Sequence, residues 1–165
     1  MFSVGVLTVS DKGSRHERED LSGEAIQKAL SPLNVTIAKQ DIVPDEKHLI
    51  AQRLTAWADS GEVDLVVTTG GTGLAPRDVT PEATLSIIDK EVPGFGEAMR
   101  AYSLTKVPTA MLSRALAGIR KRTLIINLPG SPKAVTECLD AILPALPHAI
   151  ETLRGEVEEC GTAEP

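Results

Sequence analysis

The stretch that decides the fold is TTGGTGLAPRDVTPEAT, residues 68–84. It follows the apolar run VDLVV at residues 63–67 and leads into a helical pattern that begins near Pro81. A buried strand, a glycine-rich turn and a helix form the unit that builds parallel sheets. The same unit holds phosphate groups, because glycines without a Cβ let an anion approach backbone N–H groups closely. We therefore predict an α/β fold with an anion site at this turn.

Side chains near the glycines extend this prediction to phosphate and metal chemistry. Arg77 is a candidate to pair with phosphate, and Asp78 is a candidate to hold a metal ion that bridges phosphates. Thr80 is expected to cap the next helix, with Pro81 in its first position. A P-loop is excluded because no Lys follows the glycines, and Pro76 stands where the dinucleotide fingerprint requires its last glycine. The alternative is a glycine turn that only reverses the chain.

The composition fits one domain with an aliphatic core. The chain has 165 residues, of which 42% are hydrophobic and only 2% aromatic, and this favours a mainly parallel sheet covered by helices. The net charge of −6 argues against nucleic acid as a partner, and an anionic substrate here needs local cations, helix N-termini or a metal. Cys138 and Cys160 form neither a zinc pattern nor a disulfide framework, and Cys138 is expected in the core.

Nothing in the sequence predicts export or membrane insertion. The N-terminus lacks the basic start and long apolar run of a signal peptide, and no apolar stretch approaches the roughly 20 residues that span a bilayer. We expect a cytoplasmic protein without membrane contact. A single domain is predicted over residues 1–165, with an acidic tail from Gly155 that is expected to fray.

Hydrophobic patterns place strands and helices in alternation, which predicts a three-layer α/β/α sandwich with a mainly parallel central sheet. The predicted strands are residues 4–9, 34–43, 63–67 and 124–128. The predicted helices begin after Asp20 or Ser22, at Asp45, at Pro81, at Glu97 and after Ser131, and residues 12–20 are predicted to be a loop. Residues 107–117 are left open between a short strand and a loop. If the first, third and last strands are central, their carboxyl ends bring residues 10–11, 70–78 and 130–131 into one pocket.

Three further segments stand out beside the glycine turn: LTVSDKGSRHEREDLSG at 7–23, PGFGEAMRAYS at 93–103 and INLPGSPKAV at 126–135. Together with residues 68–84, they resemble the molybdenum-cofactor biosynthesis family that includes the Mog-type enzymes. The resemblance implies transfer of AMP from ATP to the terminal phosphate of molybdopterin, with Mg²⁺ bridging the phosphates. It also implies a homotrimer, with the molybdate-insertion enzyme as a further partner. The alternative is a non-enzymatic molybdopterin carrier of the same superfamily.

The resemblance also implies site residues. Asp45 and Asp78 match the family's acidic pair, so both are expected to be catalytic and to bind Mg²⁺. By position alone, Asp45 is alternatively the N-cap of a helix over residues 45–60. Nucleotide or phosphate contacts are expected from Ser10, Asp11, Gly70, Gly71, Thr72, Gly73 and Arg77. Molybdopterin contacts are expected from Ser103, Ser113, Asn127, Gly130 and Ser131. Ser113 and Asn127 are alternatively hydrogen-bonding residues of a loop and a strand.

Overall fold

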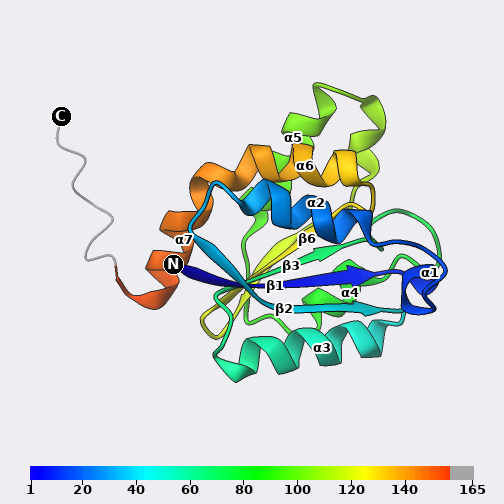
Figure 1. Ribbon diagram of the computed structural model, residues 1–165. Coiled ribbons are helices and arrows are strands. Elements are labelled where there is room, and N and C mark those ends of the chain that lie inside the picture. The colour runs from blue at the N-terminus through cyan, green and yellow to red at the C-terminus, as the bar shows by residue number, and fades with distance from the viewer. Residues whose placement is uncertain (157–165) are drawn as a thin grey trace.

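The computed structural model describes residues 1–156, which form a six-stranded sheet between two layers of helices (Figure 1). The strand order is β2-β1-β3-β6-β5-β4; the first four strands are parallel, and the pairs β6–β5 and β5–β4 are antiparallel. The strands are β1 (Phe2–Val9), β2 (Val35–Val43), β3 (Leu65–Thr69), β4 (Lys90–Glu91), β5 (Ala117–Arg120) and β6 (Thr123–Leu128). The predicted α/β sandwich is therefore confirmed.

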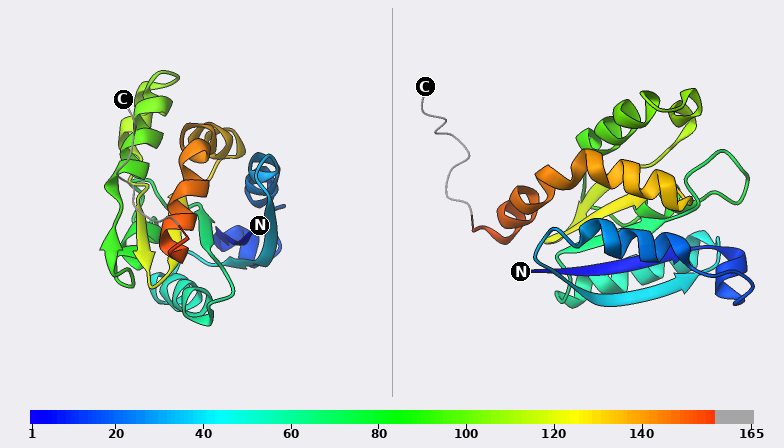
Figure 2. Two further views of the ribbon diagram at one scale, coloured as in Figure 1. Left: turned by 90° about the vertical axis from the view of Figure 1, so that its left-hand side faces the viewer. Right: turned by 45° about the horizontal axis from the view of Figure 1, so that its top comes forward.

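The helices divide between the two faces of the sheet, as the end-on view in Figure 2 shows. One face is covered by α2 (Leu21–Leu30), α5 (Pro93–Leu104), α6 (Pro132–Ile142) and α7 (Leu146–Arg154), and the other by α3 (Lys47–Ser60) and α4 (Thr80–Leu85). Three short turns complete the fold: α1 (Asp11–Ser14), η1 (Pro108–Leu112) and η2 (Leu143–Ala145). The core is aliphatic, as the composition predicts.

Strand β3 shows why the sheet must be covered on both sides. All five of its residues are buried, and Leu65 and Val67 point into the layer of α2 and α6 while Val66 points toward α3. Strand β2 lies at the edge of the sheet and alternates between exposed and half-buried residues along most of its length. It is therefore less buried than β1.

The register of the central strands brings three loops to one end of the sheet. Thr69 of β3 lies opposite Thr8 of β1 and Leu128 of β6, so all three strands finish at the same level. The loops that follow these strands contain Ser10, the glycine turn and Gly130. The predicted site residues therefore gather at the carboxyl edge of a parallel sheet, where open α/β folds bind ligands.

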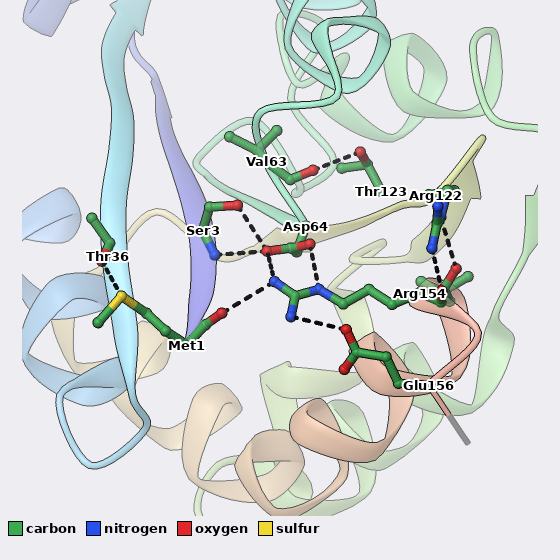
Figure 3. Close-up of polar contacts among 10 residues, drawn as sticks. Met1, Ser3, Thr36, Val63, Asp64, Arg122, Thr123, Arg154 and Glu156 are labelled. Atoms are coloured by element: carbon green, nitrogen blue, oxygen red, sulfur yellow. Dashed lines mark hydrogen bonds and ion pairs between the residues drawn. The ribbon is translucent and has the colours of Figure 1, made fainter. Parts of the chain in front are cut away.

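The opposite end of the sheet is closed by an ion pair between α7 and the start of β3 (Figure 3). Arg154 donates from Nε and one terminal nitrogen to the two oxygens of Asp64, at 2.9 and 2.7 Å. The same carboxylate accepts hydrogen bonds from the N–H and hydroxyl groups of Ser3, both at 2.7 Å. Burial acts to raise the pKa of Asp64, but the hydrogen bonds from Arg154 and Ser3 outweigh it and hold that pKa at about 2.

The predicted helix cap at Thr80 is wrong, and the alternative cap at Asp45 is also absent, because each side chain is engaged elsewhere. Glu46, not Asp45, precedes α3, and the Asp45 carboxylate instead accepts a hydrogen bond from the N–H of Asp11 at 2.8 Å. Thr80 is the first residue of α4 rather than its cap, and its hydroxyl donates to the carbonyl of Gly70 at 2.9 Å. The predicted cap at Ser131 is confirmed, since its hydroxyl accepts a hydrogen bond from the N–H of Ala134.

Several element boundaries also differ from the prediction. Residues 93–96 begin α5 rather than interrupt the chain, since proline is tolerated in the first helical turn. The helix after Thr80 ends at Leu85, and residues 90–91 pair with β5 as β4. The predicted loop at 12–20 contains most of α1, and the open segment at 107–117 contains η1 and the first residue of β5. The frayed tail and Cys160 fall largely outside the described residues, and no helix within residues 1–156 has the length and apolar composition to cross a membrane.

Candidate functional site

The main cavity of the candidate site, about 530 Å³, opens where β3 and β6 end, between the glycine turn, α5, η1 and the start of α6. Many of the residues predicted from the sequence line it together. These are Gly71, Thr72, Gly73, Asp78, Ser103, Ser113, Gly130 and Ser131. The structure thus joins the predicted phosphate turn and most of the predicted molybdopterin contacts in a single space.

The glycine turn has a backbone that only glycine adopts without strain. Gly70 has φ of 98° and Gly71 has φ of 67°. A Cβ on Gly70 would lie 2.3 Å from the carbonyl oxygen of Val9, and one on Gly71 would lie 2.4 Å from Oγ1 of Thr80. The glycines are therefore required for the close packing of this turn against β1 and α4.

Two carbonyl groups of the turn accept hydrogen bonds from neighbouring segments. The carbonyl of Gly71 accepts the N–H of Thr80 at 3.1 Å, and that of Thr72 accepts the N–H of Arg114 at 2.9 Å. The N–H groups of Gly71, Thr72 and Gly73 have no acceptor within residues 1–156, whereas the N–H of Gly70 donates to Leu128 at 3.1 Å. Successive free N–H groups with the carbonyls held away form an anion-binding nest. Gly70 shapes this nest but does not contribute a free N–H group to it.

Arg114 holds the far side of the turn, and sequence reasoning did not select it. Its guanidinium donates to the carbonyl of Gly73 at 2.7 Å and to that of Asp78 at 2.6 Å, and it pairs with the carboxylate of Glu82. These contacts connect both ends of the loop between β3 and α4 to the segment before β5. The only sequence signal was a basic residue in the segment left open at 107–117, because its partners are backbone groups about 40 residues away.

Asp45 and Asp78 both lie beside the glycine turn. Asp45 exchanges hydrogen bonds with Asp11, accepting the Asp11 N–H at Oδ2 and donating its own N–H to the Asp11 carboxylate at 3.1 Å. Its Oδ1 would be 3.3 Å from a Cβ on Gly71, whereas Oδ2 of Asp78 would be 2.8 Å from a Cβ on Gly73. Asp78 lines the cavity and Asp45 does not.

The charges around Asp45 suit a bound cation. Burial is the main cause that raises the pKa of the Asp45 carboxyl, and the negative charges of Asp11 and Asp78 add to this effect against the Asp11 N–H and Arg77. One oxygen of Asp45 and one of Asp78 accept no hydrogen bond in the described chain. Mg²⁺ binds through one or two carboxylates together with phosphate oxygens, so each of these free oxygens has the chemistry of a Mg²⁺ ligand. Residues 1–156 contain no group of three or more His, Cys, Asp or Glu side chains arranged for a metal.

Arg77 does not face the main cavity. Its guanidinium donates to both oxygens of Asp11, at 2.6 and 2.9 Å, and to Glu46 at 2.9 Å. The hydrogen bond from Arg77 is the main cause that lowers the pKa of the Asp11 carboxyl. Arg77 therefore connects the loops after β1, β2 and β3, and a phosphate would have to compete with two carboxylates for it.

The predicted single pocket is divided in two. Ser10 lines a smaller cavity of about 110 Å³ together with Gly70 and Gly130, and its hydroxyl caps α1 by accepting the N–H of Gly13 at 3.0 Å. The division arises because the loops touch: a Cβ on Gly130 would lie 3.4 Å from Cα of Gly70. Ser10 and Asp11 are thus near the turn but outside the main cavity.

Asn127 is the predicted molybdopterin contact that the structure places away from the cavity. Its side chain is fully buried, and Nδ2 donates to the hydroxyls of Thr68 and Thr84 at 3.0 and 2.9 Å. It joins β3, β6 and α4 under the glycine turn, which is the structural alternative that its position on a strand allows. In contrast, Ser103 lies at the cavity wall with its Oγ 3.8 Å from Sγ of Cys138.

Comparisons with known proteins agree with this geometry. The model of a family described as a probable molybdopterin binding domain matches residues 5–148. Two proteins named molybdopterin adenylyltransferase are similar to the chain. The protein of Helicobacter pylori J99 is 53% identical, and the match covers 92% of this chain and 88% of the relative. The protein of Escherichia coli K12 is 41% identical, and the match covers 94% of this chain and 87% of the relative. A crystal structure of the molybdopterin biosynthesis enzyme MoaB from Thermus thermophilus superposes with a TM-score of 0.89 at 54% identity, covering 94% of this chain and 98% of that one.

Proposed function

The chain belongs to the family of the probable molybdopterin binding domain, and from that premise we propose that it is a molybdopterin adenylyltransferase of molybdenum cofactor biosynthesis. In the proposed reaction, the terminal phosphate of molybdopterin attacks the α-phosphate of ATP. The products are molybdopterin-AMP and pyrophosphate. The names of relatives that are 41% and 53% identical support this role.

The observation that carries the proposal is the nest of N–H groups at Gly71, Thr72 and Gly73. These groups open to a cavity of about 530 Å³, large enough for a drug-sized ligand, with Asp78 at its edge. A protein with net charge −6 repels two anionic substrates, and fixed N–H dipoles in a narrow site counter that repulsion locally.

The chemistry requires alignment and charge neutralisation rather than a protein nucleophile, because the attacking oxygen belongs to molybdopterin. In this proposal, the nest holds the ATP phosphates, and Ser103, Ser113, Gly130 and Ser131 contact molybdopterin on the other side of the cavity. Asp78, with Asp45 beside the glycine turn, would hold Mg²⁺, which would supply positive charge to neutralise the phosphates. Arg114 keeps the loop that carries Asp78 in place.

Three finer assignments belong to the same proposal. We place the chain in the adenylyltransferase branch of the family, rather than among relatives that only bind molybdopterin, on the segments at 68–84 and 126–135. We also propose a cytoplasmic homotrimer that hands its product to the molybdate-insertion enzyme. Light scattering of the purified protein, together with adenylylation under anaerobic conditions, tests the assembly and the branch.

The central experiment measures pyrophosphate release from purified protein given molybdopterin, ATP and Mg²⁺. Asp78→Ala should reduce turnover at least a hundredfold, in the range that removal of a group stabilising transition-state charge produces. Asp140→Asn serves as the matched control, because Asp140 is an exposed carboxylate on α6. Normal turnover by Asp78→Ala with an unchanged melting curve would remove Asp78 from the mechanism.

The carrier alternative predicts a different pattern of binding. Calorimetry with ATP and with molybdopterin separately distinguishes the two, since a carrier binds molybdopterin alone. An adenylyltransferase binds both ligands and releases pyrophosphate only when both are present.

A further inference from the structure

Two charged side chains on the wall of the main cavity have no role in the proposed phosphate chemistry. Arg100 on α5 and Glu137 on α6 both line the cavity and are half-buried. Figure 1 shows these helices side by side, and Ser103 and Cys138 touch between them. Within residues 1–156, neither charge forms an ion pair. A half-buried charge that no protein group neutralises is costly, so its retention in a cavity wall needs a reason.

The two residues line the same cavity from neighbouring helices. Arg100 precedes Ser103 by three residues, which places both on the same face of α5, and Glu137 adjoins Cys138 on α6. Met99 and Ala134, one beside Arg100 and one a turn before Glu137, supply apolar surface there. An apolar slot that carries one acceptor and one donor is suited to a flat heterocycle with polar edges.

The hydrogen-bonding capacity of each side chain defines what the heterocycle must offer. The Glu137 carboxylate accepts no hydrogen bond from the described chain, and a carboxylate can only accept, so its ligand must donate. One terminal nitrogen of Arg100 donates to the carbonyls of Ala115 and Ser113, at 2.6 and 3.3 Å. The other nitrogens of that guanidinium have no acceptor within residues 1–156, so Arg100 calls for a ligand that accepts.

The pyrimidinone ring of a pterin meets both requirements. Its N3–H and 2-amino groups are adjacent donors with the geometry of a guanidinium edge, which a carboxylate binds through two parallel hydrogen bonds. Its 4-carbonyl oxygen, next to N3, is an acceptor. We propose that Glu137 recognises the amino edge of the pterin and that Arg100 binds its carbonyl, so that this pair selects pterins over other flat ligands. This inference rests on the proposed function for the identity of the ligand.

The test compares two stable ligands that differ at one position. The probe is 6-hydroxymethylpterin phosphate, and the comparison ligand is the corresponding lumazine phosphate, in which a carbonyl replaces the 2-amino group. Fluorescence titration of the native protein should show roughly ten- to a hundredfold tighter binding of the pterin, because the lumazine leaves the carboxylate facing an acceptor. Glu137→Gln should abolish or invert this preference, since an amide both donates and accepts.

Two further variants complete the experiment. Asp140→Asn, an exposed neutral substitution on the same helix, should keep the full preference. Arg100→Lys should weaken both ligands by a similar factor, because their 4-carbonyl groups are identical and a lysine lacks the planar fork. An unchanged preference in Glu137→Gln, or the absence of any preference in the native protein, overturns the assignment of Glu137, and unchanged affinities in Arg100→Lys overturn that of Arg100.

The outcome is separable from adenylyl transfer. If native protein releases pyrophosphate but Glu137→Gln keeps its preference for pterin, the subsite falls and the proposed function stands. If the preference depends on Glu137 but no pyrophosphate is formed, the subsite stands and the protein is a carrier.

Discussion

Substitution of Gly71 by alanine tests the packing of the glycine turn, and the chain supplies its own control. Gly71 has φ of 67° and Gly61, at the end of α3, has φ of 71°. A Cβ on Gly71 would meet Thr80 Oγ1 at 2.4 Å and Asp45 Oδ1 at 3.3 Å, whereas a Cβ on Gly61 would meet nothing within 4 Å. The two substitutions share the backbone strain and differ only in the contacts.

The magnitudes follow from these two contributions. Alanine in the left-handed region costs about 1–2 kcal/mol, which is the whole expected loss for Gly61→Ala. In Gly71→Ala, the Thr80 hydroxyl must also move and release the buried hydrogen bond to Gly70, and an unsatisfied buried group costs about 1–3 kcal/mol more. We expect Gly71→Ala to lose about 2–5 kcal/mol of unfolding free energy.

Urea unfolding measures both losses, and calorimetry with ATP measures the functional effect. Gly71→Ala should weaken ATP binding because it shifts an N–H of the nest and the Asp45 carboxylate beside it, whereas Gly61→Ala should bind ATP normally. The double variant Gly71→Ala with Thr80→Ala should lose less stability than the sum of the single variants, because the clashing hydroxyl is gone. Equal losses for Gly61→Ala and Gly71→Ala, or strict additivity with Thr80→Ala, would refute this reasoning.

Two more predictions concern Arg114 and Asp64. Arg114→Lys should lower ATP affinity about tenfold, because one ammonium cannot hold the Gly73 and Asp78 carbonyls together. The control is Arg122→Lys, which loses carbonyl contacts at the other end of the sheet. Equal ATP affinity in the native protein and both variants would contradict the role of Arg114. Because the pKa of Asp64 is depressed to about 2, its stabilisation is present above pH 4 and is lost as the pH falls from about 4 to 2. The Asp64 side chain is only 17% exposed, so we expect the free energy of unfolding to fall by about 2 kcal/mol over this range, as measured by urea unfolding at a series of pH values. Asp64→Asn should remove that part of the acid dependence. The same loss of stability at low pH in the native protein and in Asp64→Asn would contradict this prediction.

Local patterns were sufficient wherever one segment carried its own explanation. The buried strand β6, the cap at Ser131 and the proline in the first turn of α6 follow from neighbouring residues, and all three are present in the structure. The predicted caps at Asp45 and Thr80 failed for the opposite reason. Each has a side chain suited to capping, but a distant loop offers it a better partner.

The candidate site follows the same division. The sequence indicated the glycine turn and Asp78, because glycines and a carboxylate next to a strand end are a local signal. It did not indicate Arg114, Arg100 or Glu137, because an isolated charge in a helix or an irregular segment has no pattern that separates a cavity wall from a solvated surface. Asn127 was expected to contact molybdopterin from the family resemblance, with a strand role as the alternative, and only the structure shows that its side chain bonds to Thr68 and Thr84.

The sequence by itself determined that this protein is a mainly parallel α/β sandwich with a glycine turn after a central strand, since hydrophobic periodicity, glycines and helix caps act within short segments of the chain. Only the tertiary structure decided which polar groups remain free for a ligand. The parallel register brings the loops after β1, β3 and β6 together. There Arg77 donates hydrogen bonds to Asp11, and the N–H groups of Thr80 and Arg114 donate to carbonyls of the turn. Within residues 1–156, the N–H groups of the nest in the glycine turn have no acceptor, and Arg100 and Glu137 form no ion pair. These groups therefore remain available to a ligand.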